Sequence, residues 1–243
     1  MLRPFTAALF ATTLFCAPAL AQSVSPAITA AVADAGRPAA DKERDATRKP
    51  AETVAFAGVK SGMTVAELGP GRGYYTRILA KAVGPSGKVY AIVTPAQAAR
   101  PGALDGLNAL AASYPNIKVV TSELPALMLP EKADLFWTTE NYHDFHNGPT
   151  ADIAGLNKAV FNNLKSGGIF YVEDHSAAPG AGLAATSAFH RMDEAVAKTE
   201  LTAAGFKLDA EGDLLHNPAD NKAASNSESG HFVSDRFMLR MKR

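Results

Sequence analysis

Residues 65–76 read Val-Ala-Glu-Leu-Gly-Pro-Gly-Arg-Gly-Tyr-Tyr-Thr, and this stretch decides the fold class. A short apolar strand ends near an acid, glycines follow at alternate positions, and Tyr74 opens a helix. Glycine is required where the backbone turns left-handed or lies flat against a ligand. The helix directs its free N–H groups and the positive end of its dipole at whatever lies over the loop. The stretch therefore predicts a loop that holds a nucleotide-like ligand.

The glycine spacing separates this loop from a dinucleotide site. Gly69 and Gly71 fit the pattern Gly-x-Gly-x-x-Gly, but the third glycine, Gly73, comes one residue early. Glu67 precedes the first glycine, whereas the ribose-binding acid of a dinucleotide site lies about 20 residues downstream. The motif Glu-x-Gly-x-Gly-x-Gly resembles the first motif of class I S-adenosylmethionine-dependent methyltransferases. The resemblance implies S-adenosyl-L-methionine as cofactor, held by the three glycines, with Glu67 near its methionine amine or the loop amides.

The first 21 residues are typical of a secretory signal peptide. Arg3 is the only charged residue before position 22, residues 5–15 are mostly apolar, and Ala19-Leu20-Ala21 offers a small-x-small cleavage site. The apolar run is shorter than the roughly 20 residues that a membrane-spanning helix needs. We therefore expect cleavage, export to the periplasm or the medium of a bacterium, and no stable membrane insertion.

Composition narrows the function of the mature chain. Cys16 would leave with the signal, which excludes a cysteine nucleophile, a disulfide frame and a thiolate metal site. Without Arg3, 23 basic residues would face 24 acidic ones in no marked blocks, so nucleic acid is not expected as a partner. The remaining chain of about 220 residues suffices for one core. We divide it into an alanine-rich leader, residues 22–40, and one domain, residues 41–243; the oligomeric state stays open.

Strands and helices alternate along this domain. The predicted strands cover residues 63–68, 88–93, 117–121, 133–138, 169–173, 206–215 and 231–241. The predicted helices cover residues 41–59, 74–83, 95–113 in two pieces, 152–164 and 187–204, and a polar link, 217–230, is expected to be mobile. Such alternation predicts an α/β fold with a parallel sheet covered on both faces. The last two strands lack an intervening helix, which predicts an antiparallel C-terminal hairpin. A Rossmann-like seven-stranded, mostly parallel sheet ending this way is the class I methyltransferase arrangement.

Ligands bind beyond the carboxyl ends of strands in such sheets, which points to several cofactor contacts. Tyr74 opens the helix after the glycine loop and is placed against the ligand. The resemblance implies that Glu123, after the third strand, lies near the adenine. It also implies an acid for the ribose hydroxyls at the end of the second strand, where Val93 stands instead. Thr94 can offer the ribose only one weaker hydrogen bond in place of that acid. Each lost hydrogen bond to a charged group lowers the binding free energy by about 1.5–3 kcal/mol.

Residues 140–146, after the fourth strand, hold the densest set of reactive side chains. His143 is the candidate general base with Asp144 as its orienting partner, or the reverse. Asn141 is placed against the cofactor and Tyr142 against the substrate. A structural role for His143, capping the next helix or bonded to backbone, stays open beside this interpretation.

Two further histidine–acid pairs are expected at the same cleft. Asp174 and His175 follow the fifth strand, and we predict a substrate-binding role for Asp174 and a catalytic role for His175. His190 and Asp193 lie one helical turn apart on the predicted helix, with His190 near the substrate. Imidazole and carboxylate groups together can also bind a metal. Because no tight ligand spacing such as His-Glu-x-x-His occurs, no residue is assigned as a metal ligand.

Several short runs also resemble a bacterial subgroup of exported methyltransferase-like proteins, over residues 41–240. Besides the glycine loop, the similar runs are Asn141-Tyr142-His143-Asp144, Leu164-Lys165-Ser166-Gly167-Gly168, Asp174-His175, His190-Arg191-Met192-Asp193 and Ser234-Asp235-Arg236-Phe237. The leading hypothesis is methyl transfer to a small-molecule acceptor. Val93 and export away from cytoplasmic cofactor favour a non-catalytic ligand-binding or accessory protein instead. A metal-assisted enzyme built on the histidine–acid pairs is the third hypothesis.

Overall fold

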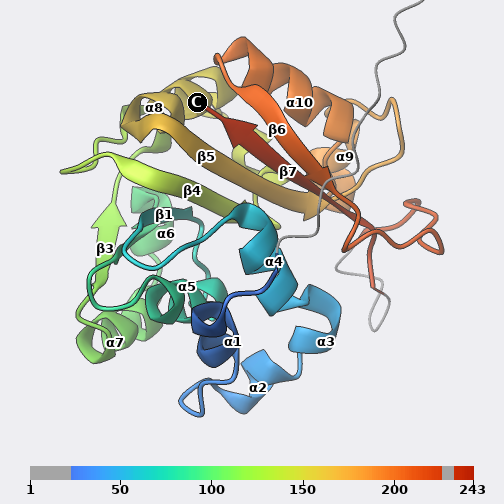
Figure 1. The fold of residues 1–243 in the computed structure, drawn as a ribbon. Coiled ribbons are helices and arrows are strands. Elements are labelled where there is room, and N and C mark those ends of the chain that lie inside the picture. The colour runs from blue at the N-terminus through green and yellow to red at the C-terminus, as the bar shows by residue number, and fades with distance from the viewer. Residues whose placement is uncertain (1–22, 226–232) are drawn as a thin grey trace, which may run out of the picture.

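The computed structural model describes residues 23–225 and 233–243, which form one seven-stranded sheet with helices on both faces (Figure 1). The order is β3-β2-β1-β4-β5-β7-β6, with β1 to β5 parallel and β7 antiparallel to both its neighbours. The strands are β1 (Thr64–Leu68), β2 (Lys88–Val93), β3 (Ile117–Thr121), β4 (Ala133–Thr139), β5 (Leu164–His175), β6 (Lys207–Gly212) and β7 (Arg236–Lys242). The predicted fold class is confirmed.

The helices fall into two groups on opposite faces of the sheet (Figure 1). The helices of the N-terminal half are α1 (Pro26–Val32), α2 (Ala39–Lys42), α3 (Asp45–Arg48), α4 (Pro50–Ala57), α5 (Tyr74–Val83), α6 (Pro95–Ala98) and α7 (Asp105–Ser113). After them come the 3₁₀ turns η1 (Leu124–Ala126) and η2 (His143–His146), then α8 (Ile153–Asn163), α9 (Ala184–Phe189) and α10 (Glu194–Ala203). One core lies between the sheet and α1, α4 and α5, and the other lies between the sheet and α8 and α10.

Burial on both faces explains why the central strands are apolar throughout. Every residue of β1 is buried, because successive side chains point into the two different cores. Helix α1 also belongs to the first core, through Ile28 and Ala31, so the segment before residue 41 packs on the domain. Among the described residues no helix has the length and apolar character needed to cross a membrane.

Where local signals are strong, the predicted elements match the structure. Helix α5 and strands β2 and β3 have the predicted bounds, and residues 95–113 form two helices, α6 and α7. Ile78, Leu79 and Val83 face the core as expected, each with no exposed surface. The reason is that turns with glycine or proline bound these segments closely.

The predicted helix 187–204 is wrong, because two helices replace it. His190 takes a left-handed conformation with φ +49°, and Asp193 is the N-cap of α10, so the two do not share a helix face. Between them Met192 donates its N–H to His175 O at 2.8 Å and accepts from Ala177 N at 2.9 Å. Pairing with the end of β5 therefore replaces helical bonds in this segment.

Other elements also differ from prediction: β6 ends at Gly212 rather than at residue 215, and β7 begins at Arg236 rather than at residue 231. Residues 41–59 form three short helices, because Lys49 has φ +42° and Pro50 starts α4 at its first turn. Strand β5 begins at Leu164 rather than 169, with a register shift against β4 that absorbs the two glycines. The predicted signal peptide lies outside the described residues, as do residues 226–230 of the predicted mobile link and residues 231 and 232 of the predicted last strand.

Candidate functional site

The glycine loop turns sharply between β1 and α5. Gly69, Gly71 and Gly73 all have positive φ, at +64°, +56° and +84°. A Cβ on Gly69 would lie 2.9 Å from Asn141 Cγ, and one on Gly73 would lie 2.8 Å from a methyl of Leu110. A Cβ on Gly71 would meet nothing within 4 Å. Gly69 and Gly73 are thus required by packing, whereas Gly71 leaves open space above the loop.

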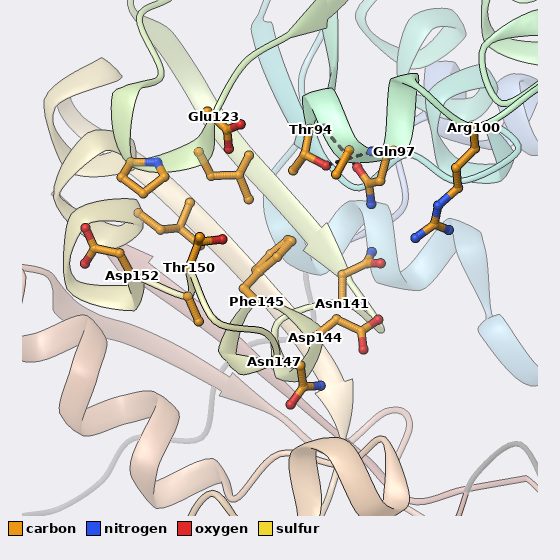
Figure 2. A pocket seen from close by; sticks show the side chains of 15 residues that line it. Thr94, Gln97, Arg100, Glu123, Asn141, Asp144, Phe145, Asn147, Thr150 and Asp152 are labelled. Atoms are coloured by element: carbon orange, nitrogen blue, oxygen red, sulfur yellow. Dashed lines mark hydrogen bonds between the residues drawn. The ribbon is translucent and has the colours of Figure 1, made fainter.

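Two cavities lie on either side of Asn141, at the carboxyl ends of the parallel strands. The first, here the loop cavity, has about 390 Å³ and is lined by Gly69, Gly71, Tyr74, Glu67, Asn141 and the arginines 44, 48 and 72, among others. The second, here the α6 cavity, has about 450 Å³ and is lined by Thr94, Gln97, Arg100, Glu123, Asn141 and Asp144, among others (Figure 2). Asn141 lines both cavities and donates to Gly69 O at 3.1 Å, which fixes its side chain where the cavities meet.

Glu67 lies at the bottom of the loop cavity, with only 3% of its surface exposed. Its carboxylate accepts one hydrogen bond, from Thr76 Oγ1 at 2.6 Å. Burial raises the pKa of Glu67 to about 7, and the bond from Thr76 only partly opposes the rise. The side chain therefore titrates near neutral pH and can respond to a cation placed in the cavity.

The raised pKa of Glu67 makes stability depend on pH. Between pH 4.5 and 7 the unfolded state loses this proton while the folded state keeps it, so the wild type loses stability as pH rises. The Glu67→Gln variant keeps the Thr76 bond and cannot ionise. We expect it to gain about 3 kcal/mol relative to the wild type between pH 4.5 and 8. Urea unfolding across this range measures the difference; exposed Glu43→Gln is the control, and parallel curves for wild type and Glu67→Gln would contradict the prediction.

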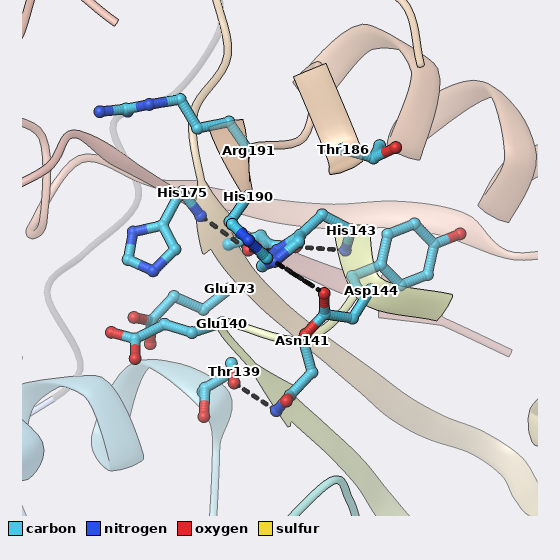
Figure 3. A network of polar contacts seen from close by, with 12 residues as sticks. Thr139, Glu140, Asn141, His143, Asp144, Glu173, His175, Thr186, His190 and Arg191 are labelled. Carbon is cyan, nitrogen blue, oxygen red and sulfur yellow. Dashed lines mark hydrogen bonds and ion pairs between the residues drawn. The ribbon is translucent and has the colours of Figure 1, made fainter. Parts of the chain in front are cut away.

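His143 is held between two carboxylates at the end of β4 and β5 (Figure 3). Asp174, with no exposed surface, accepts from His143 Nδ1 at 2.8 Å and from its backbone N–H at 2.6 Å. Burial lowers the pKa of His143, but Asp144 and Asp174 outweigh it and raise the pKa to about 10. Each ring nitrogen of His143 thus faces a carboxylate, and the choice of base between His143 and Asp144 stays a prediction.

The other predicted substrate and catalytic residues lie at different depths. His190 approaches Asp144 Oδ1 at 3.6 Å, so the loop after β5 does meet the loop after β4. His175 bonds Ser234 Oγ at 2.6 Å, and burial lowers its pKa to about 4. Tyr142 is fully buried against α8 and α10, with its hydroxyl donating to Glu200, and lines neither cavity. The structure therefore gives Tyr142 a packing role and Asp174 an orienting role.

Similarity to known proteins is visible only at the level of structure. No protein-family model and no curated protein matches the sequence. A SAM-dependent methyltransferase from Aquifex aeolicus is similar with a TM-score of 0.61 and 18% identity, over 85% of this chain and 98% of that one. The N-methyltransferase NodS from Bradyrhizobium japonicum WM9 has a TM-score of 0.55 and 14% identity, over 83% and 96%. The S-adenosylmethionine-dependent methyltransferase from Mesorhizobium loti has a TM-score of 0.54 and 16% identity, over 78% of this chain and 94% of that one. This chain has the class I methyltransferase fold.

The end of β2 carries Val93, where the sequence resemblance implied an acid. Val93 is 5% exposed and lines neither cavity. The next residue, Thr94, caps α6: its hydroxyl accepts from Gln97 N at 3.1 Å, and Gln97 Oε1 accepts from Thr94 N at 2.9 Å. Glu123 lines the α6 cavity. Gln97 and Arg100 also line it; the sequence pointed to neither, although Thr-x-x-Gln is a capping-box signature.

A buried ionic cluster under the loop cavity was also missed by the sequence analysis. Arg236 donates to Glu140 at 3.0 Å and to Glu173 at 2.9 Å, and Arg48 pairs with Glu140. Burial raises the pKa of Glu173, whereas the neighbouring arginines outweigh burial and lower the pKa of Glu140. The members come from α3, β5, β7 and the position directly after β4, so no local sequence pattern could group them.

Proposed function

We propose that the protein is a methyltransferase that uses S-adenosyl-L-methionine on a small-molecule acceptor. The observation that carries the proposal is the pair of cavities that meet at Asn141 over the glycine loop. Together they provide an elongated site with an acid and arginines at one end and a glutamate and amide at the other. The chain's own residues thus fit an elongated cofactor with a charged amino-acid end.

The loop cavity suits the methionine end of this cofactor. Glu67 offers a carboxylate to the ammonium group, and Arg44 and Arg48 offer charge to the carboxylate. In the α6 cavity, Gln97 and Glu123 offer polar contacts to the ribose and adenine. When bound, the cofactor supplies an electrophilic methyl group, so the protein mainly has to position the acceptor.

The acceptor is expected on the side of the α6 cavity that Asp144 and Phe145 form. Asp144 is half exposed there. Burial alone would raise the pKa of its carboxylate, but His143 and His190 outweigh this effect and lower the pKa. An acceptor with an O–H or N–H group can reach this carboxylate. We also propose that the chain is exported, on the evidence of its first 21 residues.

Calorimetric titration of the purified protein with S-adenosylmethionine and with its demethylated product tests the proposal. We expect binding of both at one site, and transfer of a labelled methyl group to a member of a hydroxyl and amine panel. Absence of binding at millimolar ligand would refute the proposal. Binding without transfer would favour the non-catalytic alternative, for which Val93 in place of a ribose-binding acid is the supporting observation.

A further inference from the structure

Three side chains beside the α6 cavity bring one ligand atom each to a common point. His143, Asp144 and His190 place a ring nitrogen or carboxylate oxygen within 4.8 Å of one another (Figure 3). His143 and Asp144 belong to η2, after β4, whereas His190 follows α9 and has a left-handed backbone conformation. Two imidazoles and one carboxylate form a donor set that divalent transition metals prefer.

The distances within this triad differ from those of ordinary ion pairs. His143 Nδ1 lies 2.8 Å from Asp174, a normal charge-assisted hydrogen bond. By contrast, Asp144 Oδ1 lies 3.3 Å from His143 Nε2 and 3.6 Å from His190 Nδ1. Two ligands at about 2.0–2.1 Å from a tetrahedral ion are about 3.4 Å apart. Two of the three distances between ligand atoms therefore match those around one tetrahedral ion, and all three atoms lie within 4.8 Å of one another.

Asp174 orients the first imidazole in the way that metal sites require. It accepts both the ring Nδ1–H and the backbone N–H of His143, and it is itself completely buried. This leaves Nε2 directed at Asp144. Metal-bound histidines almost always donate their other ring N–H to such a partner.

His190 is held rigidly as well. The following residue, Arg191, is 1% exposed and donates to Ser176 O at 3.0 Å and to Asp220 at 2.8 Å. Its backbone N–H donates to Ala185 O, at 3.2 Å. These bonds keep His190 in a left-handed conformation that costs a non-glycine residue about 1–2 kcal/mol. Such a backbone conformation persists where the surrounding structure fixes it.

We propose that His143 Nε2, Asp144 and His190 Nδ1 bind a divalent first-row transition metal ion, with Asp174 as the partner that orients His143. Because three protein ligands leave at least one position open, and Asp144 lines the α6 cavity, the ion can also take an oxygen of the acceptor. Coordination lowers the pKa of a bound hydroxyl. This part rests on the proposed function and identifies hydroxyl compounds as the acceptor class.

Titration of the purified, tag-free protein with Co²⁺ tests the site without cofactor or acceptor. Saturation at one equivalent with visible d–d absorption bands, and displacement by Zn²⁺, are expected. The absence of such bands would overturn the proposal. His190→Asn suits the left-handed backbone and removes the imidazole, and it should weaken Co²⁺ binding at least 100-fold.

Two more variants separate ligand binding from loss of structure. Asp174→Asn should weaken Co²⁺ binding about 10–100-fold. His216→Asn is the matched control, because His216 pairs with Asp235 at 2.6 Å outside the triad; its Co²⁺ affinity should equal that of the wild type. Circular dichroism checks that all variants are folded. A folded His190→Asn variant with unchanged affinity would overturn the proposal.

The proposal of a metal site and the proposal of methyl transfer can be refuted independently. Since Co²⁺ binding is measured without cofactor, the site stands even if S-adenosylmethionine does not bind. Conversely, if the protein shows no Co²⁺ bands and methyl transfer survives dialysis against a chelator, the metal site is removed and the transfer reaction stands.

Discussion

Replacing Arg236 with methionine is expected to lower the free energy of unfolding by about 3–5 kcal/mol. Its guanidinium is 3% exposed and reaches Glu173, which has no exposed surface, and Glu140. Methionine fills similar space but leaves Glu173 as a buried acid without its cation. The loss comes mainly from this unpaired charge rather than from packing.

Chemical denaturation of the Arg236→Met variant measures this loss. Adding Glu173→Gln should restore much of the stability, because the neutral amide needs no cation. Lys88→Met is the control: Lys88 pairs with Glu131 at the surface, with side chains 50% and 39% exposed, and its loss should cost much less stability than the loss of Arg236. If Arg236→Met cost no more than Lys88→Met, the expected cost of an unpaired charge at Glu173 would be refuted.

Replacing Gly71 with leucine is expected to weaken S-adenosylmethionine binding at least 100-fold, about 2.7 kcal/mol. Gly71 lines the loop cavity, and its Cβ direction points into open space. The new side chain would therefore occupy volume that the cofactor needs. With φ +56°, the substitution also strains the backbone by about 1–2 kcal/mol.

Gly180→Leu separates the two effects of this substitution. Gly180 has φ +80° and also meets nothing within 4 Å, but it lines neither the loop cavity nor the α6 cavity. Both variants should lose similar thermal stability, and only Gly71→Leu should lose cofactor affinity in calorimetry. Equal affinities in the two variants would show that the cofactor does not lie over the glycine loop.

The sheet was predictable because its signals are local. Strands β2 and β3 and helix α5 are short apolar segments bounded by glycine, proline or asparagine, and their bounds were right. The helix predicted at 187–204 failed because its alanines satisfy helical periodicity equally well on both sides of His190. What interrupts it is hydrogen bonding of Met192 to His175, which helical propensity does not reflect.

The candidate site residues also divide into those that local sequence signals located and one that they did not. Strand ends pointed to Thr94, Glu123 and Asn141, and all three line a cavity. Tyr142 was misplaced because an aromatic residue in a polar loop carries no signal of its direction, and here it fills the core.

The sequence by itself determined the class of fold and the position of the glycine loop, since both depend on periodicity and on residues within a few positions of one another. Only the tertiary structure decided which charges meet. Arg48, Glu140 and Arg236 come together from three elements, and His190 joins Asp144 rather than Asp193. Such pairings depend on sheet order and on where loops return, and no spacing along the chain records them.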